Sequence, residues 1–257
     1  MLLRWIGKWL KAGVMEDGNW RATAQGTPRG GVISPMLANV YLHTVLDTWF
    51  DQEVRPRMRG RCFLVRFADD AVMGFASRED AQRVLEVLAK RFERFGLQLH
   101  PTKTRLVAFS GRASRAEPDD QEEDPPGTFT FLGFTHYWGR SRRGTAVLKR
   151  KTAASRLSRA LRAIRDWCRT NRHEPVREQH QQLTRKIQGH YAYYGITGNS
   201  RSLGLFFEQA KRAWRTWLSR RSQKAYMNWQ KFNALLARYR LPPPRIVHSI
   251  SRNLANP

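Results

Sequence analysis

The sequence predicts an α+β protein in which an antiparallel sheet with helices is followed by an all-α helical bundle. Short runs of β-forming residues flank Asp69 and Asp70 in the first half, whereas apolar residues recur at helical spacing through the second half. The charge is divided in the same way. Residues 140–257 hold 27 basic and 4 acidic residues, or +23 of the net +25, and residues 1–139 carry only +2. We therefore expect two domains that meet at residue 139.

The composition limits the class of protein. A length of 257 residues, of which 41% are hydrophobic, suffices for a core and argues against disorder throughout. No apolar stretch approaches the roughly 18 residues that a membrane span needs, so we expect no membrane partner. The two cysteines, Cys62 and Cys168, are too few for a four-cysteine zinc site or a disulfide framework, which is typical of a reduced, cytoplasmic compartment.

The first elements are a helix over residues 1–15 and a glycine- and proline-rich loop over residues 25–31. Ser34 and Pro35 then predict a helix start, with Ser34 as the N-cap and Pro35 at the first helical position. The free backbone N–H groups of such a loop beside a helix start favour the approach of a phosphate or a base, although an ordinary tight turn is the alternative.

Residues 78–95 predict an amphipathic helix, because their apolar side chains share one face, and Gly96 ends it. Short strands are expected at residues 97–99 and 105–109. The acidic, proline-containing segment at about residues 111–127 predicts a disordered surface insertion, with a metal site as the sharper alternative.

The second half is expected to be helical after a strand over residues 129–138. Four runs of apolar residues at helical spacing predict four helices with short links, which suggests a small bundle. These helices cover about residues 157–168, 175–194, 203–222 and 225–239.

The charge of this half indicates a polyanion binder. Arginine suits phosphate contact and base stacking, and tryptophans and tyrosines lie between the arginines, which favours nucleic acid over a membrane surface. A generic solvated basic face is the alternative. The candidate phosphate contacts are Arg156, Arg159, Arg162, Arg165, Lys211, Arg212, Arg215, Arg220 and Arg221.

The motif Phe67-Ala68-Asp69-Asp70 places two carboxylates at the tip of a predicted strand–turn–strand. Adjacent carboxylates repel each other, and a divalent cation removes that repulsion. Mg²⁺ prefers oxygen ligands, often one or two carboxylates together with substrate phosphates. The motif therefore predicts a phosphoryl-transfer metal site at Asp69 and Asp70, and a solvated Asp-Asp turn is the alternative.

Together these segments resemble the reverse transcriptase/maturase proteins encoded by group II introns. Four blocks carry the resemblance in the family's order: Gln25–Leu42, Phe67–Asp70, Gly96–Thr104 and Phe131–Phe134. The C-terminal half is similar to the family's thumb or maturase domain at the tyrosine-rich Gln188–Gly195 and at two closing segments, Arg220–Ser222 and Leu241–Ile246. The resemblance implies a partial right-hand polymerase palm with its catalytic Asp-Asp hairpin, followed by a basic thumb or maturase domain that grips intron RNA and assists splicing.

The resemblance also implies the chemistry and the contacts. It implies RNA-directed DNA polymerisation with Mg²⁺, or alternatively Mn²⁺, on an RNA template with a DNA primer, in which Asp69 is the principal metal ligand and Asp70 a weaker one. Tyr191 and Tyr194 join the expected RNA contacts. The expected nucleotide or template contacts are Gln25, Gly26, Pro28, Arg29, Gly30, Ser34, Phe67 and Lys103.

The sequence departs from the family pattern before the Gln25 loop. Family polymerases carry fingers and a first palm strand there with a further metal-binding Asp, and Met1 begins after that point. Arg29 stands where Gln is frequent, and Phe67 where Tyr is commoner. We therefore expect the chain alone to extend primers poorly or not at all, and an upstream reverse transcriptase fragment to be its partner. A non-catalytic RNA-binding maturase fragment is the alternative.

Overall fold

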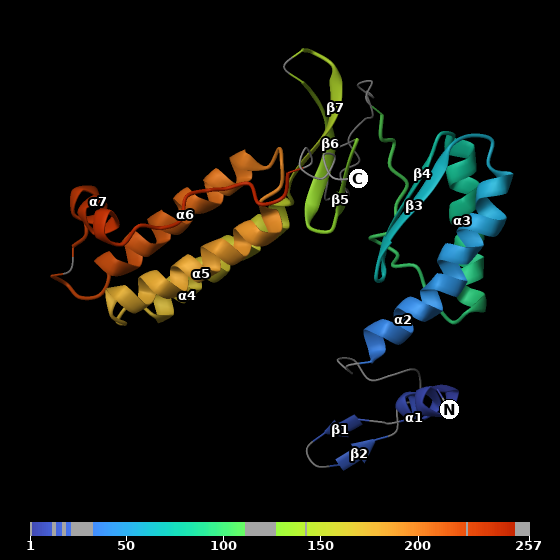
Figure 1. Ribbon diagram of the computed structural model, residues 1–257, viewed down its shortest axis with the longest axis horizontal. Coiled ribbons are helices and arrows are strands. Elements are labelled where there is room, and N and C mark those ends of the chain that lie inside the picture. The colour runs from blue at the N-terminus through green and yellow to red at the C-terminus, as the bar shows by residue number, and fades with distance from the viewer. Residues whose placement is uncertain are drawn as a thin grey trace. The chain divides into compact units, whose positions relative to one another are not determined.

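The computed structural model describes residues 2–11, 14–16, 19–21, 33–110, 127–141, 143–224 and 226–249. The chain divides into two compact units, Met1–Leu106 and Val107–Pro257 (Figure 1). Both units combine helices with small antiparallel sheets, which confirms the α+β class, while the polymerase arrangement stays a prediction. In the described part of the chain, no helix has the length and apolar character that crossing a membrane requires.

The first unit begins with elements that differ from the predicted long helix. Helix α1 is Leu2–Leu10, and β1 (Val14–Glu16) pairs antiparallel with β2 (Asn19–Arg21). Helix α2 (Ser34–Leu42) is capped by Ile33 without a side-chain hydrogen bond, so the predicted N-cap at Ser34 is wrong by one residue, although a proline does occupy the first turn. The helical path continues through η1 (His43–Thr48), η2 (Phe50–Val54) and η3 (Arg55–Arg57).

A hairpin and a helix complete the core of this unit. Strand β3 (Cys62–Phe67) pairs antiparallel with β4 (Asp70–Phe75), and α3 (Arg78–Arg94) follows. Leu64 and Met73 on one face of the hairpin pack against a buried cluster. This cluster consists of Leu46, Trp49, Phe50, Val54, Val84 and Leu88.

The strands predicted at residues 97–99 and 105–109 are absent from this described region. Gly96 has a positive φ of 66°, and the Leu97 N–H donates to the carbonyl of Phe92 at 2.8 Å, which closes the end of α3. Leu99 then packs against the buried cluster. The apolar alternation at residues 97–99 therefore reflects packing against the helix and not strand pairing.

The second unit starts with a three-stranded antiparallel sheet in the order β5-β6-β7. Its strands are β5 (Thr128–Phe131), β6 (Phe134–Arg140) and β7 (Ala146–Thr152). The single strand predicted over residues 129–138 is thus a hairpin, turned by Leu132 and Gly133 with φ values of 49° and 77°. Two positive φ values are typical of a type I′ turn.

The sheet belongs with the helices and not with the first half. Strand β7 leads directly into a helix that begins at Ala154, and buried Asn199 joins this strand to the later helices. The Asn199 Oδ1 atom accepts from the Thr152 N–H at 2.9 Å, and its Nδ2 atom donates to the carbonyl of Tyr194 at 2.8 Å. The compact units therefore divide at Leu106 and not at residue 139, and the second half is not all-α.

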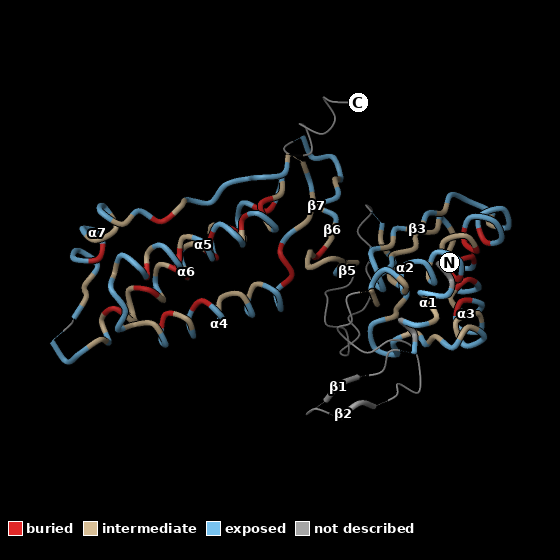
Figure 2. Tube along the Cα trace, turned by 60° about the horizontal axis from the view of Figure 1, so that its bottom comes forward, coloured by how far each residue is buried: buried red, intermediate tan, exposed pale blue. Residues whose placement is uncertain are grey.

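The four predicted helices are present. They are α4 (Ala154–Thr170), α5 (Val176–Tyr194), α6 (Ser200–Ser219) and α7 (Trp229–Arg238). Their buried residues form one core, seen as the red segments of α4, α5 and α6 in Figure 2. Inside this core the indole N–H of Trp214 donates to Gln179 Oε1 at 2.9 Å, so these two buried polar groups satisfy each other.

Candidate functional site

The two acidic residues lie at the tip of the β3–β4 hairpin. Phe67 and Asp70 are the last cross-strand pair, so Ala68 and Asp69 form a two-residue turn. Ala68 has a φ of 53°, an unfavourable value for a residue with a Cβ atom. A positive φ at the first turn residue alone is the pattern of a type II′ turn, which matches the twist of the strands. The turn therefore places Asp69 and Asp70 at the tip of the hairpin, and both are exposed.

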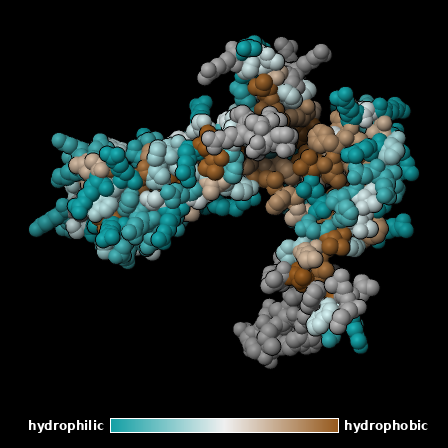
Figure 3. Space-filling model, viewed as in Figure 1, coloured by the Kyte–Doolittle hydropathy of each residue, from teal (hydrophilic) through white to brown (hydrophobic). Residues whose placement is uncertain are grey.

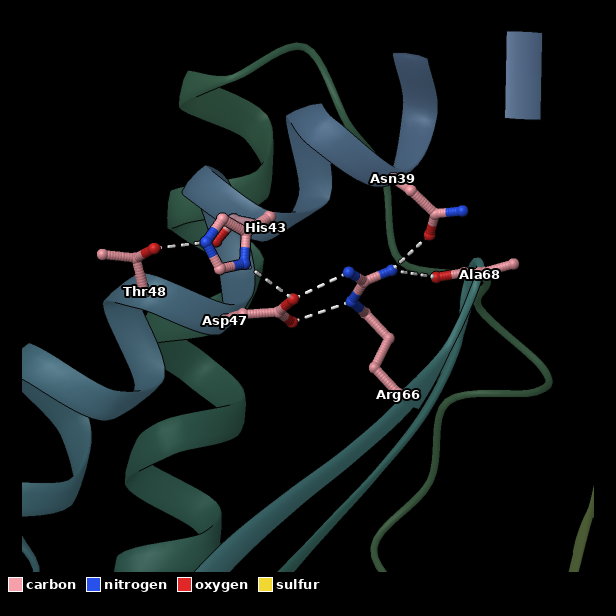
Figure 4. A network of polar contacts seen from close by, with 6 residues as sticks. All are labelled: Asn39, His43, Asp47, Thr48, Arg66 and Ala68. Carbon is pink, nitrogen blue, oxygen red and sulfur yellow. Dashed lines mark hydrogen bonds and ion pairs between the residues drawn. The ribbon is translucent and has the colours of Figure 1, made fainter. Parts of the chain in front are cut away.

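Arg66 connects this turn to the helix that precedes the hairpin (Figure 4). Its Nε and Nη2 atoms donate to the two carboxylate oxygens of Asp47 at 2.7 Å each. Its Nη1 atom donates to Asn39 Oδ1 and to the carbonyl oxygen of Ala68, each at 2.8 Å. One planar guanidinium thus holds α2, η1 and the turn together, and Ala68 is the residue next to Asp69.

The Arg66–Asp47 pair is largely shielded from water. The Arg66 side chain is 13% exposed and that of Asp47 is 24% exposed. The hydrogen bonds from Arg66 lower the pKa of Asp47, against an opposing effect of burial, and the same hydrogen bonds raise the pKa of Arg66. His43 lies beside the pair, with Nδ1 at 3.4 Å from Asp47 Oδ2. Both members of the pair are therefore charged at neutral pH.

The hairpin face that points away from the buried cluster carries exposed apolar side chains. Phe63, Val65 and Phe67 alternate on this face of β3, and Phe67 is 65% exposed. Because Phe67 and Asp70 are cross-strand partners, an exposed aromatic ring lies on the same face as one of the two carboxylates. An aromatic face beside a carboxylate pair suits a nucleotide, with the ring against the base or sugar and the metal-bound phosphates at the acids.

The other predicted nucleotide contacts are less informative. Ser34 is a half-buried residue at the start of α2, and Lys103 is exposed in a turn after α3. No contact in the described residues joins Lys103 to the Asp-Asp turn. Gln25, Gly26, Pro28, Arg29 and Gly30 lie outside the described residues.

The donor set fits a hard divalent cation in part. Asp69 and Asp70 supply carboxylate oxygens, which Mg²⁺ and Mn²⁺ prefer. Within the residues that the structure describes, no group of three or more His, Cys, Asp or Glu residues is placed to hold a metal. Two carboxylates match a site whose remaining ligands are substrate phosphates and water, as is usual for Mg²⁺.

Arg66, Asp47 and Asn39 are not among the site residues that the sequence predicts. A signal was present for Arg66, which is the single charged residue in an otherwise apolar strand and directly precedes the motif. Its partner Asp47 is 19 residues earlier and on a helix, so no local pattern connects the two.

The predicted RNA contacts of the second unit fall into three groups. The exposed arginines stand on α4 and α6 or at the end of α6 and have no ion pair within the described residues. They are Arg156, Arg159, Arg162, Arg165, Arg212 and Arg220. The face of this helical bundle shown in Figure 3 is mainly hydrophilic.

Lys211 and Arg215 form the second group, because both are engaged within the protein. Lys211 Nζ lies 3.1 Å from a carboxylate oxygen of Glu208. Arg215 Nη1 donates to the carbonyl of Met227 at 3.1 Å, and its guanidinium lies 4.3 Å from the ring centroid of Trp229. Arg215 therefore holds the segment before α7 against α6, whereas Lys211 is paired within α6 itself.

The third group consists of one buried and two half-buried residues that contact the rest of the helical unit. Tyr191 is fully buried, its hydroxyl donates to the carbonyl of Pro242 at 3.3 Å, and burial raises its pKa. Arg221 donates to the carbonyls of Arg172 and Glu174 and so closes the α4–α5 turn. Tyr191 and Arg221 are therefore residues of the folded framework, and we do not retain them as direct RNA contacts. Tyr194 is half-buried against Phe134.

His190 also has a structural environment. Its ring stacks on Phe206 at 3.7 Å, and burial lowers its pKa to about 4. The imidazole is therefore neutral at pH 7 and contributes packing, not charge, to this part of the molecule.

The comparison with protein families places the hairpin in a known class. Residues 1–136, more than half of the chain, match the family model described as reverse transcriptase (RNA-dependent DNA polymerase). The chain belongs to this family.

Two relatives narrow the assignment. The group II intron-encoded protein LtrA of Lactococcus lactis subsp. cremoris is 34% identical over 96 residues, which cover 34% of this chain and 16% of LtrA. The protein YkfC of Escherichia coli (strain K12) is 44% identical over 57 residues, which cover 22% of this chain and 13% of YkfC. The chain thus matches only a small part of each relative. The predicted membership among group II intron reverse transcriptase/maturase proteins is confirmed.

Proposed function

We propose that this protein catalyses RNA-directed DNA polymerisation as part of a group II intron reverse transcriptase/maturase. The observation that carries the proposal is the two-residue turn that presents Asp69 and Asp70 together, inside the segment that matches the reverse transcriptase family. Arg66 supports it, because its guanidinium binds the carbonyl next to Asp69 and restrains the turn.

In this proposal Asp69 is the principal ligand of Mg²⁺ or Mn²⁺, and Asp70 is a weaker ligand. Metal ions at such sites stabilise the charge that develops on the attacking and leaving oxygens. The protein's own contribution is positioning: the hairpin fixes the carboxylates, and the exposed ring of Phe67 borders the nucleotide. Turnover by this chain alone is expected to be slow, because the described residues supply only two acidic ligands at the turn.

The second unit is proposed to bind intron RNA and the template–primer. The support is its charge, with 27 basic and 4 acidic residues after residue 139, and the six exposed arginines on or next to α4 and α6. Such binding is dominated by phosphate contacts and weakens steeply with salt.

Primer extension on an RNA template with Mg²⁺ tests the catalytic proposal. Wild type, Asp69→Ala and Glu86→Gln, a charge-matched change at an exposed acid on α3, are compared at equal concentration. We expect slow extension by wild type and Glu86→Gln and none by Asp69→Ala. Extension that Asp69→Ala leaves intact would contradict the assignment of the site.

A second candidate function is splicing assistance by RNA binding without polymerisation. The observation that favours it is that the described residues place only two candidate metal ligands at the turn. Filter binding to a structured group II intron RNA distinguishes the two functions. Tight, salt-sensitive binding together with no extension by any variant would support this candidate over the first.

A further inference from the structure

A cavity lies between α4 and α6 in the helical bundle. Its volume is about 260 Å³, and its lining includes Arg165 from α4 with Arg212, Thr216, Trp217 and Arg220 from α6 and its end. Three of the predicted phosphate contacts thus meet at one place, although Arg165 is 47 positions before Arg212 and 55 before Arg220. The packing of α4 against α6 through the buried core fixes this arrangement.

The charges around the cavity are uncompensated. Within the described residues, the side chains of Arg165, Arg212 and Arg220 have no ion pair. Residues 140–257 contain only four acids, and Glu208, the one on α6, is paired with Lys211. Three guanidinium groups that share a cavity repel one another, so an anion bound there lowers the electrostatic energy.

An aromatic ring lies beside these cations. Trp217 packs in part against the bundle core and in part lines the cavity, and the Arg220 guanidinium lies 5.3 Å from its ring centroid. An indole ring beside guanidinium groups suits a phosphate joined to a base, because the base stacks while the phosphate accepts from arginine. Only an unpaired nucleotide offers its base face in this way.

We infer that this cavity binds one unpaired nucleotide of an RNA strand, with the base against Trp217 and its phosphate held by Arg165, Arg212 and Arg220. The inference rests on the proposed RNA-binding function and adds a defined site to it. It separates this cavity from the remaining basic surface, which contacts phosphates without regard to whether the bases are paired.

The test measures binding of the full chain to a fluorescein-labelled octauridylate and to an eight-base-pair RNA duplex by anisotropy, at 50, 100 and 200 mM KCl. The pocket variant is Arg165→Gln with Arg212→Gln. The control variant, Arg177→Gln with Arg185→Gln, removes the same charge from exposed positions on α5. A third variant, Trp217→Leu, keeps an apolar side chain without the aromatic face.

The expected result is a loss of octauridylate affinity of at least about fivefold for Trp217→Leu, with little effect on the duplex. The pocket variant should lose more affinity than the control, and its salt slope should fall by about 1.4, as for two fewer phosphate contacts to a single strand. Circular dichroism verifies folding. The two arginines are exposed, so their variants carry the test if Trp217→Leu unfolds.

Two results overturn the inference. Equal losses in the pocket and control variants, or equal effects of Trp217→Leu on single strand and duplex, would show diffuse charge and no nucleotide site, while RNA binding itself would stand. Failure of the wild-type chain to bind either RNA would overturn the proposed RNA-binding function together with the inference.

Discussion

Replacing Arg66 should loosen the hairpin that carries the two acidic residues. Arg66→Gln removes four hydrogen bonds, two of them to the carboxylate of Asp47, and leaves that carboxylate poorly hydrated. Removing one member of a buried ion pair costs about 3–5 kcal/mol. Because the Asp47 side chain is 24% exposed, its hydration offsets part of this cost. We therefore expect the free energy of opening the hairpin to fall by about 2–3 kcal/mol. Arg66→Lys keeps the charge but not the planar fork, so its loss should be smaller.

Hydrogen exchange with mass spectrometry measures this effect in peptides that cover β3 and β4, and peptides from the helical bundle serve as an internal reference. Arg83→Gln, at an exposed position on α3, is the charge-matched control. Unchanged protection of the hairpin in Arg66→Gln, or an equal loss in Arg83→Gln, would refute the reasoning.

The same pair predicts a pH dependence. The pKa of Asp47 is lowered in the folded protein from its usual 3.8. The contribution of the pair is therefore complete above pH 3.8 and is lost as the pH falls through the lowered pKa. The difference between wild type and Arg66→Gln should be full at pH 7 and should shrink at pH 3, after correction for the intrinsic exchange rate.

Three further predictions concern single residues. Ala68→Gly should stabilise the folded hairpin by between zero and about 1 kcal/mol, because glycine adopts the φ of 53° without strain. Protection of the hairpin in hydrogen exchange measures this change. Arg221→Gln should destabilise the helical bundle by about 1–3 kcal/mol in urea unfolding, whereas the exposed neighbour Arg220→Gln should change it by less than about 0.5 kcal/mol, because only Arg221 closes the α4–α5 turn. Burial lowers the pKa of His190 from 6.5 to about 4, so the unfolded chain binds the proton more readily than the folded one. The helical bundle should therefore lose stability as the pH falls from 6.5 to 4. His190→Phe, which can still stack on Phe206, should remove this part of the pH dependence in thermal unfolding.

The helices and the hairpin could be predicted from the sequence because their signals are local. Apolar residues at helical spacing located α3 to α7, and two β-forming runs around Asp69 located β3 and β4. Strand β7 was missed because three consecutive basic residues, Lys149 to Lys151, obscure its alternation. The sheet it completes therefore shifts the boundary between the compact units.

The site was predictable only in part. The motif located Asp69 and Asp70, whereas the ion pair that restrains their turn depends on tertiary packing between Arg66 and Asp47. For Tyr191 the local spacing and the resemblance to the family led to different predictions. Its spacing of four from Ile187 and eight from Leu183 already marked the buried face of α5, but the tyrosine-rich resemblance led to an RNA contact.

The central claim is that Asp69 and Asp70 hold a divalent metal ion, and Fe²⁺-directed hydroxyl-radical cleavage of the protein tests it most directly. Fe²⁺ replaces Mg²⁺ at carboxylate sites and cuts the backbone near the bound ion, so the measurement does not depend on turnover. In the presence of an RNA template and DNA primer, we predict cleavage centred on residues 67–70 that excess Mg²⁺ suppresses and Asp69→Ala abolishes. Absence of cleavage at the turn, or cleavage that persists in Asp69→Ala, would contradict the account.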